Sequence, residues 1–121
     1  MGKYILVVDD KPSIRLLMYE LLRDAGYQVK CISSGEECLN IARSPDKPAL
    51  IILDHKMPKL TGLEVLSILK SDQETKDIPV IMITGIEDII DEAINWGASM
   101  VLLKPFDIKK LKKVLSDLVH M

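Results

Sequence analysis

Short, continuous apolar runs recur along this chain. Four of them are Tyr4–Val8, Ala49–Leu53, Val80–Ile83 and Met100–Leu103. Runs of this length without polar alternation are typical of strands that are covered on both faces of a parallel sheet. A fifth run, Tyr27–Ile32, is interrupted by polar residues. We therefore predict five strands, of which the second lies near an edge of the sheet.

Between these runs, apolar residues recur at helical spacing. Pro12 suits the first turn of a first helix, which Gly26 ends, and Ser34 with Glu37 has the form of a capping box for a second helix. A third helix follows Gly62. The fourth is expected to bury Ile86, Ile89, Ile90, Ala93 and Ile94, and the fifth to bury Ile108, Leu111, Leu115 and Leu118. Strands that alternate with helices predict a doubly wound α/β fold, as one domain over residues 1–121.

Composition and charge narrow the function. The chain has 121 residues, 48% of them hydrophobic, and a net charge of -2, so it has no basic excess to bind nucleic acid directly. Cys31 and Cys38 are too few for a disulfide framework, which favours free thiols in a reducing compartment. The apolar run Ile5 to Val8 ends at two aspartates and is too short to cross a membrane. We expect a cytoplasmic protein without membrane contact.

Polar residues stand where the predicted strands end. Asp9 and Asp10 follow the first strand, Asp54 the third, Thr84 the fourth and Lys104 the fifth. Right-handed crossovers bring the carboxyl ends of parallel strands to the same edge of the sheet, where such folds bind ligands. These residues are therefore expected to meet.

The chemistry of this residue set is that of a magnesium and phosphate site. Carboxylate oxygens suit Mg²⁺, which commonly shares the oxygens of a phosphate. Lys104 offers a point charge and Thr84 a hydroxyl, while an aspartate such as Asp54 can attack phosphorus and form an acyl phosphate. Taken singly, each residue also has a plain structural role. Asp9 and Asp10 could cap the first helix, and Asp54 could be a turn residue.

Taken together, the motifs resemble the response-regulator receiver domains of two-component signalling. The resemblance covers almost the whole chain. It rests on the acidic pair Asp9-Asp10, on Asp54 with Met57-Pro58 and Gly62, on Thr84, and on Lys104-Pro105-Phe106. It implies a flavodoxin-like fold with strand order 2-1-3-4-5.

The resemblance also implies roles. Asp54 would accept a phosphoryl group from a phosphohistidine of a histidine kinase or a histidine phosphotransfer protein. Asp9, Asp10, Asp54 and the backbone carbonyl of Lys56 would bind Mg²⁺. Lys104 and Thr84 would contact phosphoryl oxygens, and the Lys104–Pro105 bond would be cis.

Contacts with partners follow from the same resemblance. The donor would dock at the rim and on the first helix, through Ile14 and Met18. A downstream protein would bind the face formed by the fourth helix, fifth strand and fifth helix. If the chain stops at the fifth helix, we expect it to signal by contact with another protein or by onward phosphotransfer. A piece cut from a longer protein would look the same.

One position departs from the family pattern. Receiver domains usually carry Tyr or Phe three residues before the lysine, and here that residue is Val101. Without a rotating aromatic side chain, output would depend on the loop after Thr84 and on the fourth helix.

Other functions remain open on the sequence. A small Mg²⁺-dependent phosphatase would place a second carboxylate two residues after its nucleophile, where this chain has Lys56. An interaction module with this fold need not be phosphorylated at all. A flavin-binding protein would need a phosphate loop after the first strand, where the acidic pair stands. We expect no enzyme activity beyond the chain's own phosphoryl transfer and dephosphorylation.

Overall fold

A five-stranded parallel sheet forms the centre of the computed structural model, which describes residues 4–119. The strands are β1 (Tyr4–Val8), β2 (Gln28–Ile32), β3 (Leu50–Asp54), β4 (Val80–Thr84) and β5 (Met100–Leu103). Their order is β2-β1-β3-β4-β5, and each neighbouring pair is parallel. The predicted fold class and strand order are confirmed, β2 is an edge strand as predicted, and the predicted ends differ by at most one residue.

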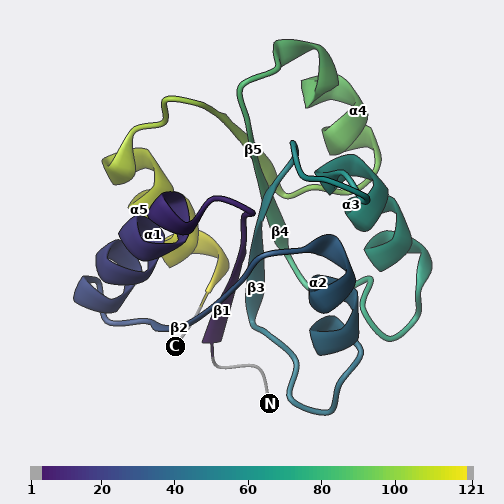
Figure 1. Cartoon of the computed structure of the whole chain (residues 1–121), viewed down its shortest axis with the longest axis horizontal. Helices are drawn as coiled ribbons and strands as arrows, with labels where there is room; N and C mark the ends of the chain where they lie inside the picture. The colour runs from purple at the N-terminus through teal and green to yellow at the C-terminus, as the bar shows by residue number, and fades with distance from the viewer. Residues whose placement is uncertain (1–3, 120–121) are drawn as a thin grey trace.

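Helices cover both faces of this sheet (Figure 1). On one side lie α1 (Pro12–Asp24) and α5 (Ile108–Leu118). The opposite side carries α2 (Gly35–Ala42), α3 (Gly62–Ser71) and α4 (Ile90–Asn95), the last preceded by the 3₁₀ turn Glu87–Ile89. Across residues 4–119, every helix is too short or too polar to span a lipid bilayer.

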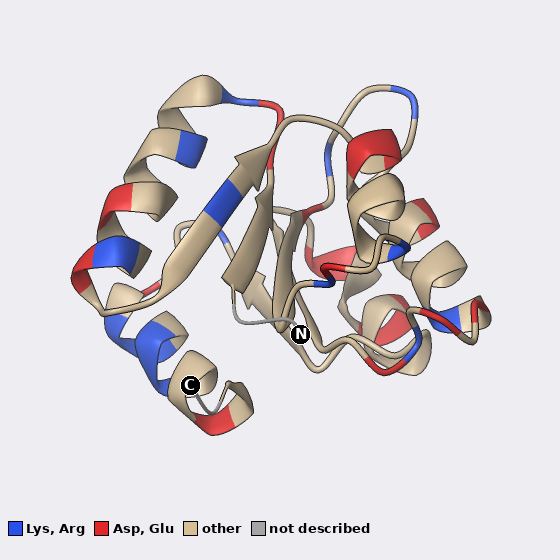
Figure 2. Cartoon of the chain, turned by 90° about the horizontal axis from the view of Figure 1, so that it is seen from below, with Lys and Arg blue, Asp and Glu red and all other residues tan. Residues whose placement is uncertain are grey.

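Two apolar clusters, one on each face, make up the core. Successive strand residues point to opposite faces, so Ile52 belongs to the cluster under α1 and α5 while Leu53 belongs to the one under α2, α3 and α4. Within the strands the only charged residues are Lys30 and Asp54 (Figure 2). Lys30 lies exposed on the edge strand β2, whereas Asp54 is buried at the end of β3.

The helix starts follow local chemistry. Pro12 is in the first turn of α1, as predicted, and the hydroxyl of Ser34 accepts the backbone N–H of Glu37 at the start of α2. A second cap was missed from the sequence. Thr61 and Glu64 form a reciprocal capping box that opens α3.

Two predicted buried faces are partly wrong. In α4 only Ala93 is buried, and Ile94 is 46% exposed, while Ile86, which precedes the 3₁₀ turn, is 42% exposed. The segment begins as a 3₁₀ turn, whose three-residue period rotates the apolar positions away from the single face that a continuous α-helix would give. In α5, Leu111 and Leu115 are buried as predicted, but Ile108 at its first turn is exposed.

The cysteines behave as free thiols. Cys38 is buried in the core, and burial raises the pKa of its thiol to about 12. Cys31 on the edge strand β2 is only half-buried, because the edge of the sheet leaves one side of it uncovered.

Candidate functional site

The ends of four strands bring the predicted site residues to one rim of the sheet. Asp54 closes β3 and pairs in register with Ile83, one residue before Thr84 at the end of β4. The backbone N–H of Lys104 donates to the carbonyl of Thr84 at 2.8 Å, which fixes the start of the loop after β5. Asp9 directly follows β1, the strand on the other side of β3.

Three carboxylates converge at this rim. Asp9, Asp10 and Asp54 each offer an oxygen, and these oxygens lie within 4.8 Å of one another. Asp9 and Asp54 are each only 3% exposed, so their charges have little water to stabilise them. A cluster of oxygen ligands at this spacing fits a hard divalent cation such as Mg²⁺.

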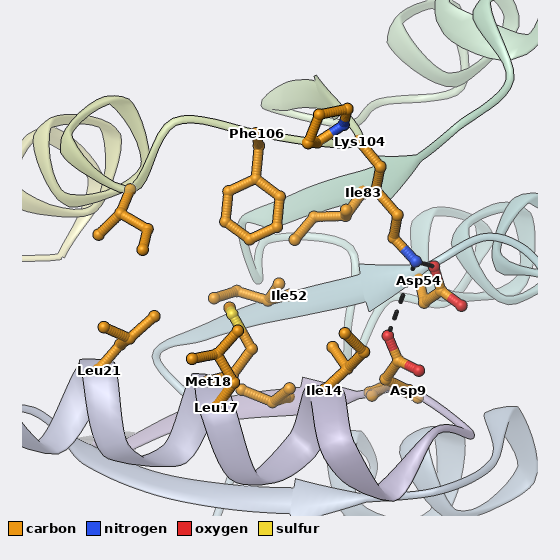
Figure 3. A pocket seen from close by; sticks show the side chains of 14 residues that line it. Asp9, Ile14, Leu17, Met18, Leu21, Ile52, Asp54, Ile83, Lys104 and Phe106 are labelled. Carbon is orange, nitrogen blue, oxygen red and sulfur yellow. Dashed lines mark hydrogen bonds and ion pairs between the residues drawn. The ribbon is translucent and has the colours of Figure 1, made fainter.

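Lys104 is one cation that stabilises these carboxylates. Its Nζ donates to Oδ1 of Asp54 at 2.8 Å and lies 4.0 Å from Oδ2 of Asp9 (Figure 3). The peptide bond between Lys104 and Pro105 is cis, as the resemblance implied. The predicted meeting of Lys104 and Asp54 is thus observed directly.

Lys11 is a second cation at the rim, and the sequence reasoning gave it no role. Its Nζ lies 3.3 Å from Oδ1 of Asp9, 3.2 Å from Oδ1 of Asp10 and 3.3 Å from Oδ2 of Asp54. Partial burial lowers the pKa of Lys11, but the bond to Asp10 and the charges of Asp54 and Asp9 outweigh it and raise the pKa above its ordinary value. The feature of the sequence that could have indicated this role is the position of Lys11 directly after Asp9 and Asp10.

The aspartate pair does not cap α1. The N-cap residue is Lys11, and no side chain caps the helix there. Asp9 instead accepts the backbone N–H of Lys11 through Oδ1 at 2.9 Å, and its own carbonyl accepts a bond from Arg15 at 2.9 Å. These bonds orient the Asp9 carboxylate toward the rim. Of the two roles considered for Asp9 and Asp10, a binding site therefore fits the structure better than a helix cap.

Thr84 is buried at the end of β4, beside the cluster but without a bond to Asp54. Its hydroxyl oxygen accepts the backbone N–H of Ile86 at 3.0 Å. A hydroxyl that accepts one bond retains its proton for donation. Thr84 can therefore donate to a group bound at the rim without losing its present contact.

The backbone around Asp54 is held from two sides. The N–H of His55 donates to the carbonyl of Ile83 in β4, and the carbonyl of His55 accepts the N–H of Gly62 at 2.7 Å. The imidazole Nδ1 of His55 accepts the N–H of Leu63 at the start of α3. His55 is thus a loop residue that positions the end of β3.

A small pocket at the rim contains Asp54 in its wall. It is lined by Lys11, Asp54, Lys56, Thr84, Gly85, Ile86 and Lys104. Lys56 is therefore near enough to the cluster for its carbonyl to be a candidate ligand. Val101 is half-buried against the core cluster on the α2, α3 and α4 side, where it packs as an aliphatic residue.

A second, apolar pocket lies next to the rim, between α1 and the loop from β5 to α5. Its volume is about 270 Å³, and Figure 3 shows Ile14, Leu17 and Phe106 around it. Met18 does not offer the exposed docking surface that was predicted for it, because it is 1% exposed on the buried side of α1, where it forms part of the pocket wall. Leu17, which is 48% exposed, presents the accessible apolar surface instead.

Comparison with known families agrees with this geometry. Residues 5–116 match the model of the response regulator receiver domain. The chain belongs to this family. The matched residues include every strand, apart from the first residue of β1, and almost all of the last helix, so the family resemblance extends over the whole sheet and its rim.

Two relatives differ in how much of their own length this chain covers. A probable transcriptional regulator, ycf27, of Cyanophora paradoxa is 39% identical over 120 residues, which is 98% of this chain and 48% of that protein. This receiver domain spans about half the length, or less, of the ycf27 proteins it matches. Sporulation initiation phosphotransferase F of Bacillus subtilis is 34% identical over 93% of this chain and 90% of its own length.

Solved receiver structures superpose along nearly the whole chain. The response regulator TrrA of Thermotoga maritima, solved in complex with Mg²⁺ and BeF, is 35% identical with a TM-score of 0.86, over 97% of this chain and 99% of its own. The chemotaxis response regulator CheY4 of Vibrio cholerae is 32% identical with a TM-score of 0.86, over 98% and 100%. Receiver domains bind Mg²⁺ at an acidic site and interact with sensor histidine kinases or phosphotransfer proteins, and the acidic cluster described above is consistent with the first of these properties.

Proposed function

We propose that Asp54 is the phosphoacceptor of this receiver domain. The observation that carries the proposal is the position of its carboxylate, buried at the end of β3 and held between the ammonium groups of Lys104 and Lys11. In the reaction, a bond forms between a carboxylate oxygen of Asp54 and phosphorus. The bond from phosphorus to the imidazole nitrogen of the donor breaks, and its electron pair stays on that nitrogen.

The oxygen cluster would hold Mg²⁺ for this reaction. Asp9, Asp10 and Asp54 supply carboxylates, and the backbone carbonyl of Lys56 supplies a further oxygen. When bound, the ion neutralises negative charge on the carboxylates and on the incoming phosphate. TrrA, the 35% identical structure, was solved with Mg²⁺ and BeF, which supports this assignment.

Lys104 and Thr84 would bind the transferred group. Lys104 already neutralises Asp54 at 2.8 Å, so it can follow the charge from the carboxylate to a phosphoryl oxygen. Thr84 can donate its hydroxyl proton while it still accepts the N–H of Ile86. That donation would couple the state of the site to the loop that begins at Gly85.

The donor is a phosphohistidine on a histidine kinase or a histidine phosphotransfer protein. We propose that it docks over the apolar pocket beside the rim, where Leu17 and Ile108 are exposed. The pocket reaches the acidic rim, because Asp9, Asp54 and Lys104 form part of its lining (Figure 3). A helix that covered the pocket would therefore bring its phosphohistidine toward Asp54.

The output surface is proposed on the other side of the rim, over α4, β5 and α5. Ile94 and Trp96 are exposed apolar residues on this surface, and basic residues cluster on α5 (Figure 2). Exposed carboxylates lie on the α4 side, at Asp91 and Glu92, so the surface offers apolar residues with charges of both signs to a downstream protein. Direct contact with nucleic acid is not expected of a chain with a net charge of -2.

We place this activity in the cytoplasm and regard the chain as one receiver domain without a separate substrate. It would catalyse only its own phosphoryl transfer and dephosphorylation. A phosphatase is disfavoured because Lys56, rather than a carboxylate, stands two residues after Asp54.

The first test is phosphorylation of wild type and Asp54→Asn by acetyl phosphate with Mg²⁺, followed by intact-mass spectrometry. We expect one added phosphoryl group on wild type and none on the variant, because an amide oxygen is a poor nucleophile. Asp117→Asn, which removes an exposed carboxylate on α5, is the matched control and should be phosphorylated as wild type is. Wild type that gains no phosphoryl group and binds no beryllofluoride would contradict the proposal, as would an adduct that persists in Asp54→Asn.

A further inference from the structure

Lys11 lies at the centre of the acidic cluster rather than beside it. Its ammonium is within 3.3 Å of an oxygen on Asp9, Asp10 and Asp54. The bond from its backbone N–H to Asp9 fixes the start of its side chain at the rim. This ammonium therefore contacts every carboxylate of the candidate metal site.

The two lysines of the site use different oxygens. On Asp54, Lys104 binds Oδ1 and Lys11 binds Oδ2, and on Asp9, Lys104 lies near Oδ2 and Lys11 near Oδ1. Lys104 thus approaches from the side of β5, and Lys11 from the side of α1. The oxygens are divided, so one lysine can leave while the other keeps its partners.

A divalent ion would compete with Lys11 in particular. The ion binds carboxylate oxygens at about 2.1 Å, and it repels an ammonium that lies among them. The side chain of Lys11 is 46% exposed, so it can turn into solvent at little cost, whereas Lys104 is 30% exposed and bonds Asp54 at 2.8 Å. Of the two lysines, Lys11 is therefore the one that costs less to move away from the carboxylates.

We propose that Lys11 is a tethered counter-ion that fills the acidic cluster until Mg²⁺ displaces it, and so sets the metal affinity of this receiver. The inference rests on the proposed function, since it takes Asp9, Asp10 and Asp54 as the metal ligands. Lys11 is then a positioning residue for the metal-free state. It keeps three close carboxylates together when no ion is present, and it makes metal binding weaker than the carboxylates alone would.

The test is a calorimetric titration of the full chain with MgCl₂. Wild type is compared with Lys11→Met, which keeps most of the length of the side chain but removes its charge, with Lys11→Arg, and with Lys113→Met as a charge-matched control on the exposed face of α5. Wild type must give up three partly exposed ion pairs of Lys11 when it binds Mg²⁺, whereas Lys11→Met has none to give up. The Kd of Lys11→Met for Mg²⁺ should therefore be roughly 3- to 10-fold lower than that of wild type. Lys11→Arg should stay near wild type, and Lys113→Met should not change the Kd by more than about twofold.

Thermal unfolding supplies a second readout that a general charge effect would not reproduce. In excess EDTA, Lys11→Met should melt below wild type, because three carboxylates lose a shared cation. Saturating Mg²⁺ should raise the Tm of Lys11→Met more than that of wild type, since the ion no longer has to displace an ammonium.

The outcomes separate this inference from the proposed function. If Lys11→Met and wild type bind Mg²⁺ with equal Kd, or if the variant binds more weakly, the counter-ion role is wrong while the metal site stands. If neither protein binds Mg²⁺, the metal site itself is wrong, and the counter-ion role is wrong with it. A lower Kd in Lys11→Met, with wild-type behaviour in Lys113→Met, supports both.

Discussion

At the scale of single residues, the position of Asp54 depends on a glycine eight residues later. A Cβ atom on Gly62 would lie 2.5 Å from the carbonyl oxygen of Asp54 and 2.6 Å from Cα of His55. Both are backbone atoms, so neither can rotate away. Only glycine lets the start of α3 approach the end of β3 this closely.

Gly62→Ala is therefore expected to destabilise the fold. Overpacking against backbone should lower the free energy of unfolding by about 1–3 kcal/mol, even though alanine favours helices. Urea unfolding followed by circular dichroism measures the change. Gly85→Ala is the matched control, because a Cβ there meets no atom within 4 Å, and it should stay within about 0.5 kcal/mol of wild type. Equal losses in the two variants would contradict the close approach.

At the scale of elements, the loop between Asp54 and α3 ends in a capping box. Thr61 accepts the N–H of Glu64 at 3.2 Å, and Glu64 accepts the N–H of Thr61 at 2.9 Å. These two bonds fix the helix start that holds His55 and Gly62, and so they help to position the end of β3.

We expect Thr61→Ala to lower the free energy of unfolding by about 1 kcal/mol, because the backbone N–H of Glu64 loses its partner. Ser67→Ala, within the same helix, removes a hydroxyl that caps nothing and should be neutral or slightly stabilising. Urea titrations of both variants measure the difference. If Ser67→Ala lowers the free energy of unfolding as much as Thr61→Ala does, the capping box does not stabilise the helix, and the prediction is wrong.

At the scale of the whole molecule, the sheet joins two apolar clusters into one unit. Ile52 and Leu53 are consecutive residues of β3, yet each packs in a different cluster. Any disruption of one face therefore passes through the same strand to the other. The chain should unfold as a single cooperative unit.

Ile52→Ala and Leu53→Ala test whether the two faces of the sheet unfold together. Each should lower the free energy of unfolding by about 2–5 kcal/mol, because both side chains are nearly inaccessible and leave a cavity. Trp96 fluorescence and far-UV circular dichroism should report one coincident transition in both variants. Leu16→Ala, at a 60% exposed position, is the control and should change stability little. Separate transitions for the two probes would show that the faces unfold independently.

Much of this architecture follows from the sequence alone. A continuous apolar run cannot be a surface strand, and apolar residues at three- and four-residue spacing form one face of a helix, so the alternation of elements was readable. Right-handed crossovers then place Asp9, Asp54, Thr84 and Lys104 on one rim without any knowledge of contacts. The structure places these residues together because each is the last residue of a strand or directly follows one.

Other features were decided by the tertiary structure. The sequence shows that Lys11 follows two aspartates, but its contact with Asp54, 43 residues away, exists only because β1 and β3 are neighbours. The exposure of Ile86 and Ile94 depends on a 3₁₀ turn that the apolar spacing does not reveal. Strand ends are fixed by local pattern, whereas the partners of a long, flexible side chain are fixed by which strands lie side by side.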